Sequence, residues 1–208
     1  GIAIAALQQL VGINVVFYYG EVLWRAAGFS EEDALMINVI SGVINVLSTV
    51  VAIMLIDKWG RKPLLLTGSV IMTVFLGILA LVFGMAETDA EGTLRLGDTA
   101  GKVALVSANL YIIGFGISWG PVMWVLLGEM FPNRIRGLAI SFVGLVNSGV
   151  SFLVQLLFPW QQANLGNATT FFIYGAFAVI GLVIIVKLLP ETREKSLEEL
   201  EAMLVGTR

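Results

Sequence analysis

Three amide side chains stand close together in an otherwise apolar stretch near the start of the chain. Gln8 and Gln9 are followed by Asn14, and two tyrosines, Tyr18 and Tyr19, come next. An amide that enters hydrocarbon without a partner costs several kcal/mol, so these groups must face protein, water or a polar ligand. Because amides offer donors and acceptors without charge, they suit a neutral ligand rich in hydroxyl groups, such as a sugar, better than an ion or a phosphate.

The amides do not share one stripe of a straight helix. Gln8 and Gln9 are neighbours on an ideal helix, whereas Asn14 lies well round the axis from both. A bend at Gly12 would let them converge on one cavity, and transporters use such irregular backbone near the membrane midplane. The alternative is that the amides bond to neighbouring helices and only hold a bundle together. Three amides within seven residues favour the ligand-binding interpretation.

Later stretches repeat this pattern of polar side chains in apolar surroundings. Asn38 and Asn45 are seven residues apart and share a helix face, with Asn45 deeper in the apolar run. Asn147 and Ser151 share a face in a later run, and Asn147 is the expected ligand contact there. Gln155 is expected nearer the outer surface.

A glycine-rich stretch that ends in Gly120-Pro121 interrupts another apolar run. Proline removes a helical hydrogen bond, so we predict a kinked or broken helix at this point. Trp119 and Trp124 flank the break, and a tryptophan within a span can stack on the apolar face of a sugar ring. The alternative for Trp119 is packing against lipid or at the membrane interface.

The elements that must position these residues are membrane helices. The chain is 58% hydrophobic and 13% charged, with a mean hydropathy of +0.92, which is typical of a membrane protein. We predict an all-α, multi-pass bundle of six spans with an amphipathic cytoplasmic tail over residues 190–208. The spans are expected at residues 2–24, 34–56, 64–86, 102–129, 135–160 and 169–189.

The distribution of lysine and arginine predicts the orientation. The turns after the second and fourth spans and the tail carry eight basic residues, whereas the opposite side has three among many acids. The positive-inside rule therefore places both termini in the cytoplasm, in a plasma membrane or a bacterial inner membrane. Asp57 and Arg61, like Glu129 and Arg136, lie at cytoplasmic helix ends. These groups could form ion pairs that open and close during transport, or a solvated rim worth little energy.

Several function classes are disfavoured. The chain has no cysteine and no histidine, which removes thiol nucleophiles, the usual zinc ligands and the commonest general base. No nucleophile and base pair and no phosphate loop are recognisable, so we expect no enzyme activity, cofactor or metal. A net charge of −3 gives no reason to expect a nucleic-acid partner.

Four ordered motifs resemble the carboxyl-terminal half of the sugar porters of the major facilitator superfamily, which include bacterial xylose/proton symporters and facilitative glucose transporters. The resemblance covers essentially the whole chain. The motifs are Gln8-Gln9-Leu-x-Gly-x-Asn14 with Tyr18-Tyr19, Asp57-Lys58-Trp59-Gly60-Arg61-Lys62, Gly120-Pro121-x-x-Trp124 with Glu129 and Arg136-Gly137, and Pro190-Glu191-Thr192-Arg193. The resemblance implies one half of a transporter, built from two inverted three-helix repeats.

The resemblance also implies roles for individual residues. Tyr18 and Tyr19 would lie in the extracellular gate. The sugar contacts would be Gln8, Gln9, Asn14, Asn45, Trp124 and Asn147, with Phe115 lining the cavity. A cytoplasmic charge network would consist of Asp57, Arg61, Glu129, Arg136 and Glu191. Ser148 and Met123 depart from the residues that many relatives carry there, which affects cavity shape and sugar preference; Arg193-Glu194 departs in the last motif.

A polar face of this kind needs a cover other than lipid. We expect a second copy of the chain or a separate amino-terminal half to supply it. The leading hypothesis is a hexose or pentose transporter half that works by alternating access. The alternative is a sugar-binding, sensing or structural module that does not transport.

Overall fold

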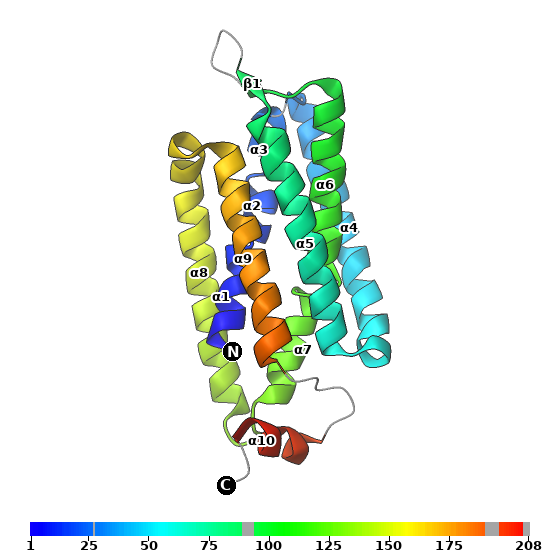
Figure 1. The fold of residues 1–208 in the computed structure, drawn as a ribbon, viewed down its shortest axis with the longest axis vertical. Helices are drawn as coiled ribbons and strands as arrows, with labels where there is room; N and C mark the ends of the chain where they lie inside the picture. Colours follow the sequence, from blue (N-terminus) through cyan, green and yellow to red (C-terminus); the bar gives the residue numbers. More distant parts are fainter. Residues whose placement is uncertain (27, 89–93, 190–195, 206–208) are drawn as a thin grey trace.

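The computed structural model describes residues 1–26, 28–88, 94–189 and 196–205. Most of its elements are helices that run side by side along one long axis (Figure 1). They are α1 (Ile2–Leu10), α2 (Ile13–Tyr18), α3 (Gly20–Ala26), α4 (Glu31–Trp59), α5 (Arg61–Gly84), α6 (Asp98–Gly116), α7 (Pro121–Met130), α8 (Arg136–Asn164), α9 (Gly166–Leu188) and α10 (Leu197–Val205). Two strands of two residues each, β1 (Glu87–Thr88) and β2 (Leu94–Arg95), pair antiparallel at one end. The all-α prediction is confirmed apart from this hairpin.

Five stretches are long and apolar enough to cross a membrane: α4, α5, α8, α9 and the pair α6–α7. The first apolar stretch is different, because the expected single span over residues 2–24 is divided into α1, α2 and α3. The expected interruption near Gly120-Pro121 is also present, between α6 and α7. Broken helices therefore occur in two of the six apolar stretches.

Several helices begin before the apolar stretch that predicted them. For example, α4 begins at Glu31 rather than near residue 34, because the Ser30 hydroxyl accepts a hydrogen bond from the Asp33 N–H (3.1 Å) and caps the helix. Polar first and last turns of this kind are helical but do not contribute to an apolar pattern. Helix length therefore exceeds the apolar length that sequence reasoning detects.

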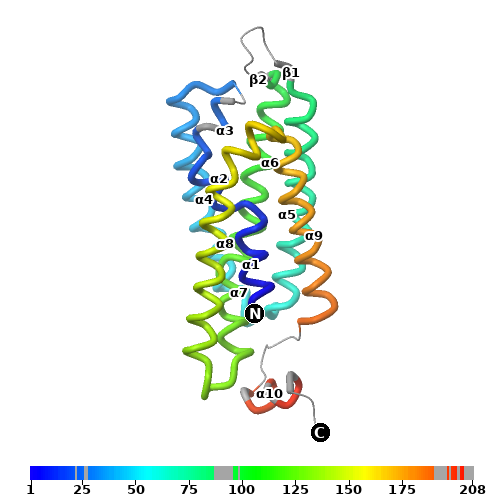
Figure 2. The backbone as a smooth tube through the Cα atoms, turned by 90° about the vertical axis from the view of Figure 1, so that its left-hand side faces the viewer, coloured from blue at the N-terminus to red at the C-terminus, as the bar shows by residue number. Residues whose placement is uncertain are grey.

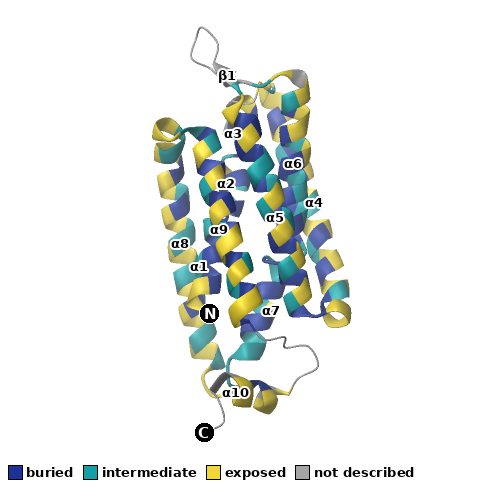
Figure 3. Ribbon diagram, viewed as in Figure 1, coloured by how far each residue is buried: buried dark blue, intermediate teal, exposed yellow. Residues whose placement is uncertain are grey.

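The outward faces of the bundle are apolar, as a lipid environment requires. Leu138, Leu81 and Phe172 have 78%, 69% and 68% of their surface exposed. Figure 3 shows exposed residues along the outer sides of α5, α8 and α9, with buried residues facing inward. Side chains of this kind are stable against hydrocarbon, so the exposed surface agrees with a multi-pass membrane protein.

The interior is held together by close helix contacts and a few polar anchors. Trp119, in the segment between α6 and α7, is buried, and its indole N–H donates to Ser69 Oγ on α5 (2.7 Å). Both sequence interpretations of Trp119, sugar stacking and packing against lipid, are therefore replaced by a place in the protein core. Its ring also lies directly against Gly181 of α9.

The two ends of the bundle differ. The short helix α10 and the start of α1 lie toward one end, and the β1–β2 hairpin lies at the other (Figures 1 and 2). The helix α10 begins with the expected capping box, in which Ser196 N–H donates to Glu199 Oε2 (2.9 Å) and Glu199 N–H donates to Ser196 Oγ (3.2 Å). Leu200 is buried, and α10 packs against α7.

Candidate functional site

The expected bend at Gly12 is present and is held by two tyrosines. Gly12 has a left-handed backbone (φ +84°), so α1 ends before it and α2 begins after it. The bend frees the Val11 carbonyl from its helical partner, and the buried Tyr111 hydroxyl of α6 donates to that carbonyl (2.7 Å). The ring of Tyr174, on α9, lies directly against Gly12. These two side chains fix the angle between α1 and α2.

This bend brings the predicted amides together. Asn14 Nδ2 donates to Gln9 Oε1, and Gln9 Nε2 donates to Asn147 Oδ1 on α8 (3.2 Å). Asn147 Nδ2 in turn donates to Gln8 Oε1 (2.7 Å) and to the Ala5 carbonyl (2.9 Å). The four amides therefore form one connected network across α1, α2 and α8.

A polar pocket of about 580 Å³ opens beside this network. Three of the predicted sugar contacts line it: Gln9, Asn14 and Asn147. Five further lining residues come from α8: Ser148, Ser151, Phe152, Gln155 and Leu156. Neutral donors and acceptors predominate, which suits a ligand with several hydroxyl groups.

The hydrogen-bonded network that lines the pocket continues along α8. Asn14 Nδ2 donates to Ser151 Oγ (2.8 Å), and Gln155 Nε2 donates to the same oxygen (2.9 Å). Gln155, which the sequence interpretation placed nearer the outer surface, lines the pocket with its side chain. The spacing of Ser148, Ser151 and Gln155, three and then four residues apart, is the signal that would have identified this face.

The two tyrosines after the amides have different environments. Tyr19 lines the pocket, its hydroxyl donates to the Gln155 carbonyl (3.1 Å), and its ring lies 4.8 Å from that of Phe158. Tyr18 instead is 72% exposed. Tyr19 is therefore the one of the pair that closes one side of the pocket in this conformation.

Gln8 supports the pocket without lining it. Its side chain is 4% exposed, and its Nε2 donates to the Trp119 carbonyl (2.6 Å) in the segment between α6 and α7. One amide thus ties the break at Gly12 to the break before Pro121. A carbonyl group at such a break lacks its helical hydrogen-bond donor. The Gln8 amide takes the place of that donor at the Trp119 carbonyl.

The remaining predicted sugar contacts lie around the second break and do not line the polar pocket. Asn45 lies beside Gly116, and its buried Oδ1 has no hydrogen-bond partner among the described residues. Phe115 is buried against Gly120, and Trp124 is half-buried against the core. The structure therefore divides the predicted contacts into two groups, joined through Gln8.

A charge cluster connects α4, α5 and α7 at the end of the bundle opposite the hairpin. Arg61 donates to Glu129 through Nε (3.0 Å to Oε2) and Nη2 (2.6 Å to Oε1), a bidentate geometry. Its Nη1 donates to Asp57 Oδ1 (3.0 Å). Arg136 instead donates to the Phe131 carbonyl (3.2 and 3.3 Å). Glu191, the fifth predicted member, lies outside the described residues.

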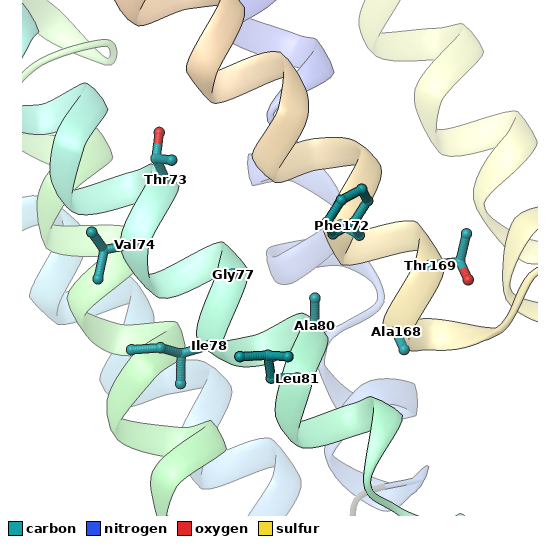
Figure 4. Close-up of a pocket in the computed structure, with 9 residues that line it drawn as sticks. All are labelled: Thr73, Val74, Gly77, Ile78, Ala80, Leu81, Ala168, Thr169 and Phe172. Atoms are coloured by element: carbon teal, nitrogen blue, oxygen red, sulfur yellow. The ribbon is translucent and has the colours of Figure 1, made fainter.

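A second hollow has a different chemistry. A groove of about 610 Å³ between α5 and α9 is lined by apolar and small side chains, including Val74, Leu81 and Phe172 (Figure 4). Thr73, one of its two hydroxyl-bearing residues, donates to the Ser69 carbonyl (2.8 Å). This groove offers few polar groups to a sugar. Within the described residues no group of three acidic, histidine or cysteine side chains could hold a metal ion.

The chain resembles known proteins over nearly its whole length. A family model described as Sugar (and other) transporter matches residues 1–204. A glucose transport protein of Synechocystis sp. is 50% identical over 200 residues, which cover 96% of this chain and 42% of that protein. The D-xylose-proton symporter of Escherichia coli K12 is 40% identical over 209 residues, covering 98% of this chain and 40% of the symporter.

Solved structures agree with these sequence matches. The proton:xylose symporter XylE bound to 6-bromo-6-deoxy-D-glucose superposes with a TM-score of 0.83 at 39% identity, covering 98% of this chain and 42% of that one. The inward-open xylose transporter XylE from E. coli gives a TM-score of 0.79 at 37% identity, with 98% and 40% covered. The chain thus spans about two fifths of the length of these relatives.

Proposed function

The chain belongs to the sugar (and other) transporter family of the major facilitator superfamily, and we propose that it forms one wall of the sugar-binding cavity of a transporter. The observation that carries this proposal is the polar pocket formed by Gln9, Asn14 and Asn147 within apolar helices. Such a pocket is costly to maintain in a membrane unless it binds something polar. The named relatives are transporters and not enzymes.

The ligand is a monosaccharide, a hexose or a pentose. The pocket volume of about 580 Å³ lies within the usual range for small-molecule sites. Gln9, Asn14 and Asn147 bond to one another in the structure, and each amide can exchange one of these bonds for a sugar hydroxyl. Ser151 and Gln155 extend the same chemistry along α8, while Asn45, Phe115 and Trp124 supply the region around the second break.

Transport proceeds by alternating access, with the two broken helices as the moving elements. Breaks near the middle of membrane helices allow half-helices to tilt around a fixed site. Tyr18 and Tyr19 act as a gate on one side of the pocket. The Arg61 cluster, with Asp57 and Glu129, fastens α4, α5 and α7 on the other side, and Arg136 and Glu191 join it in another conformation.

A second set of helices covers the open side of the pocket. Ser148 is exposed beside the polar pocket, so lipid would be a poor neighbour there. A second copy of this chain or an amino-terminal half would complete the cavity. The end that carries α10 and the basic turns faces the cytoplasm by the positive-inside rule, which places both termini there.

One alternative is a module that binds sugar without transporting it. A purely structural module is the second form of this alternative, because the mutual hydrogen bonds among the four amides satisfy these groups without a ligand. Saturable sugar flux into proteoliposomes would support the transporter. Sugar binding without flux in the full-length protein would support the module.

The pocket is tested by single amide replacements. Asn14→Ala and Gln9→Ala remove groups that line it, and we expect each to weaken monosaccharide binding by about 1–3 kcal/mol. The matched control is Asn109→Ala, which removes a partly buried amide at the α4–α6 contact that accepts from Ser41 (2.9 Å). Binding of xylose and glucose is measured by titration calorimetry on the full-length protein. Unchanged affinity in both pocket variants would return the amides to a purely structural role.

A further inference from the structure

The first apolar stretch has a second break, at Tyr19. No proline marks this break in the sequence. The chain makes only a bend at Tyr19, between the end of α2 at Tyr18 and the start of α3 at Gly20. In a continuous helix the Phe17 carbonyl would accept a hydrogen bond from the Glu21 N–H, but this hydrogen bond is missing at the bend. A freed carbonyl inside a membrane protein needs another donor.

Asn38 of α4 provides that donor. Its Nδ2 donates to the Phe17 carbonyl (3.0 Å), across 21 residues of sequence. The other end of the same amide lies against the buried Gly20, where an added Cβ would come within 2.9 Å of Asn38 Cγ. The absence of a side chain at Gly20 therefore allows the bend to approach α4 closely.

Only one end of the Asn38 amide is hydrogen-bonded among the described residues. Asn38 Oδ1 is buried and has no hydrogen-bond partner among the described residues. An unpaired buried acceptor is costly, so this contact is kept for the bond that the other end of the amide makes. A leucine at position 38 would fill similar space without donating, so packing alone does not account for the asparagine.

We propose that Asn38 is a positioning residue that locks the bend at Tyr19 to α4 and so holds the gate of the sugar pocket closed. The chain of contacts runs from α4 through Asn38 to the Phe17 carbonyl, and from the bend to Tyr19, whose hydroxyl reaches Gln155 on α8. Because α4 is unbroken from Glu31 to Trp59, it serves as a fixed support for the moving segment. This inference rests on the proposed function for the meaning of the gate, although the lock itself can be measured without sugar.

The test uses a thiol reporter on α3. This chain contains no cysteine, so Leu23→Cys places one reactive group at a buried position of α3, after any cysteine elsewhere in the full-length protein has been replaced. The rate of reaction with a charged maleimide in proteoliposomes then measures how often α3 leaves its place. Asn38→Leu and Asn38→Val are compared in this background, since neither apolar side chain can donate to the Phe17 carbonyl and leucine fills a similar space.

We expect both Asn38 variants to raise the labelling rate by about three- to tenfold, which corresponds to the loss of one hydrogen bond. Asn109→Leu, which alters the α4–α6 contact away from the bend, should leave the rate unchanged. A second reporter, Leu76→Cys in the buried core of α5, separates a local opening from general loosening. Equal acceleration at both reporters, or no acceleration by Asn38→Leu, would overturn the lock.

Sugar separates this inference from the proposed function. Labelling that depends on Asn38 in a protein that binds no monosaccharide supports the lock and contradicts the sugar site. Normal xylose or glucose binding together with labelling that does not depend on Asn38 contradicts the lock and leaves the sugar site intact.

Discussion

At the scale of single residues, the site depends on side chains that replace lost backbone hydrogen bonds. Tyr111 donates to the Val11 carbonyl at the first break, and Gln8 donates to the Trp119 carbonyl at the break before Pro121. In a membrane no water is at hand to do this, so a broken helix requires such donors. The pocket is therefore built by the same contacts that permit the breaks.

Gly12→Ala tests the bend that aligns the amides. The left-handed backbone at Gly12 costs a residue with a side chain about 1–2 kcal/mol, and the new Cβ would lie within 2.7 Å of Tyr174 Cε2. We expect a lower midpoint of thermal unfolding in detergent and weaker monosaccharide binding, because Gln9 and Asn14 no longer meet. Fluorescence unfolding curves and calorimetric titration measure the two effects.

Gly144→Ala is the matched control for this change. Gly144 is helical, and an added Cβ there meets nothing within 4 Å. Both the midpoint and the sugar affinity should stay close to those of the parent. A Gly12→Ala protein that behaves like the control would show that the bend does not need glycine.

At the scale of elements, α5 and α6 pack closely at a pair of glycines. A Cβ at Gly68 would lie 2.6 Å from the Gly114 carbonyl, and a Cβ at Gly114 would lie 2.7 Å from Ile71 Cγ2. Small residues at such crossings let membrane helices approach and gain van der Waals contact. The same contact supports Trp119, whose indole N–H reaches Ser69 on α5.

Gly68→Ala should separate these helices. We expect the free energy of unfolding to fall by about 1–3 kcal/mol, the usual cost of an overpacked contact, with a parallel loss of sugar affinity as Trp119 shifts. Gly77→Ala, in the same helix but with nothing within 4 Å of the added Cβ, should be neutral or slightly stabilising. Equal stability of the two variants, measured by denaturant titration, would contradict the close-packing argument.

The sequence predicts some of these elements well and others poorly. Long apolar runs, the bend at Gly12 and the break before Pro121 each have a strong local cause, and all three are present. The break at Tyr19 has no such local signal, because its lost hydrogen bond is replaced by Asn38 from another helix. Trp119 has the same difficulty, since its burial depends on Ser69, 50 residues away.

The candidate site was predicted only in part for a similar reason. Gln9, Asn14 and Asn147 meet in one pocket because they lie near one bend, whereas Asn45 and Trp124 surround a different break. Arg61 joins Asp57 and Glu129, but Arg136 bonds to the Phe131 carbonyl instead. Which polar groups meet depends on helix rotation, and residue spacing within one helix does not determine the rotation of its neighbours.

At the scale of the whole molecule, the polar pocket opens on a surface that lipid would not cover well. Ser148 and Phe152 line its exposed side on α8, while the apolar groove between α5 and α9 is lined almost entirely by carbon. A bilayer matches the second surface and not the first. The expected arrangement therefore buries the α8 face against other helices and leaves the α5–α9 face to lipid.

Two copies of the 208-residue chain should pair through the α8 face when no other half is present. Light scattering in detergent should then give twice the 22.4 kDa protein mass, after the detergent contribution is subtracted. In the dimer fraction a Ser148→Cys thiol should be protected from a charged maleimide relative to the monomer fraction. A Leu81→Cys thiol, at a position that is 69% exposed on the groove side, should react equally in both fractions. A monomer with a fully reactive thiol at position 148 would instead assign the cover to a different half, because the exposed polar face would then have no affinity for its own copy.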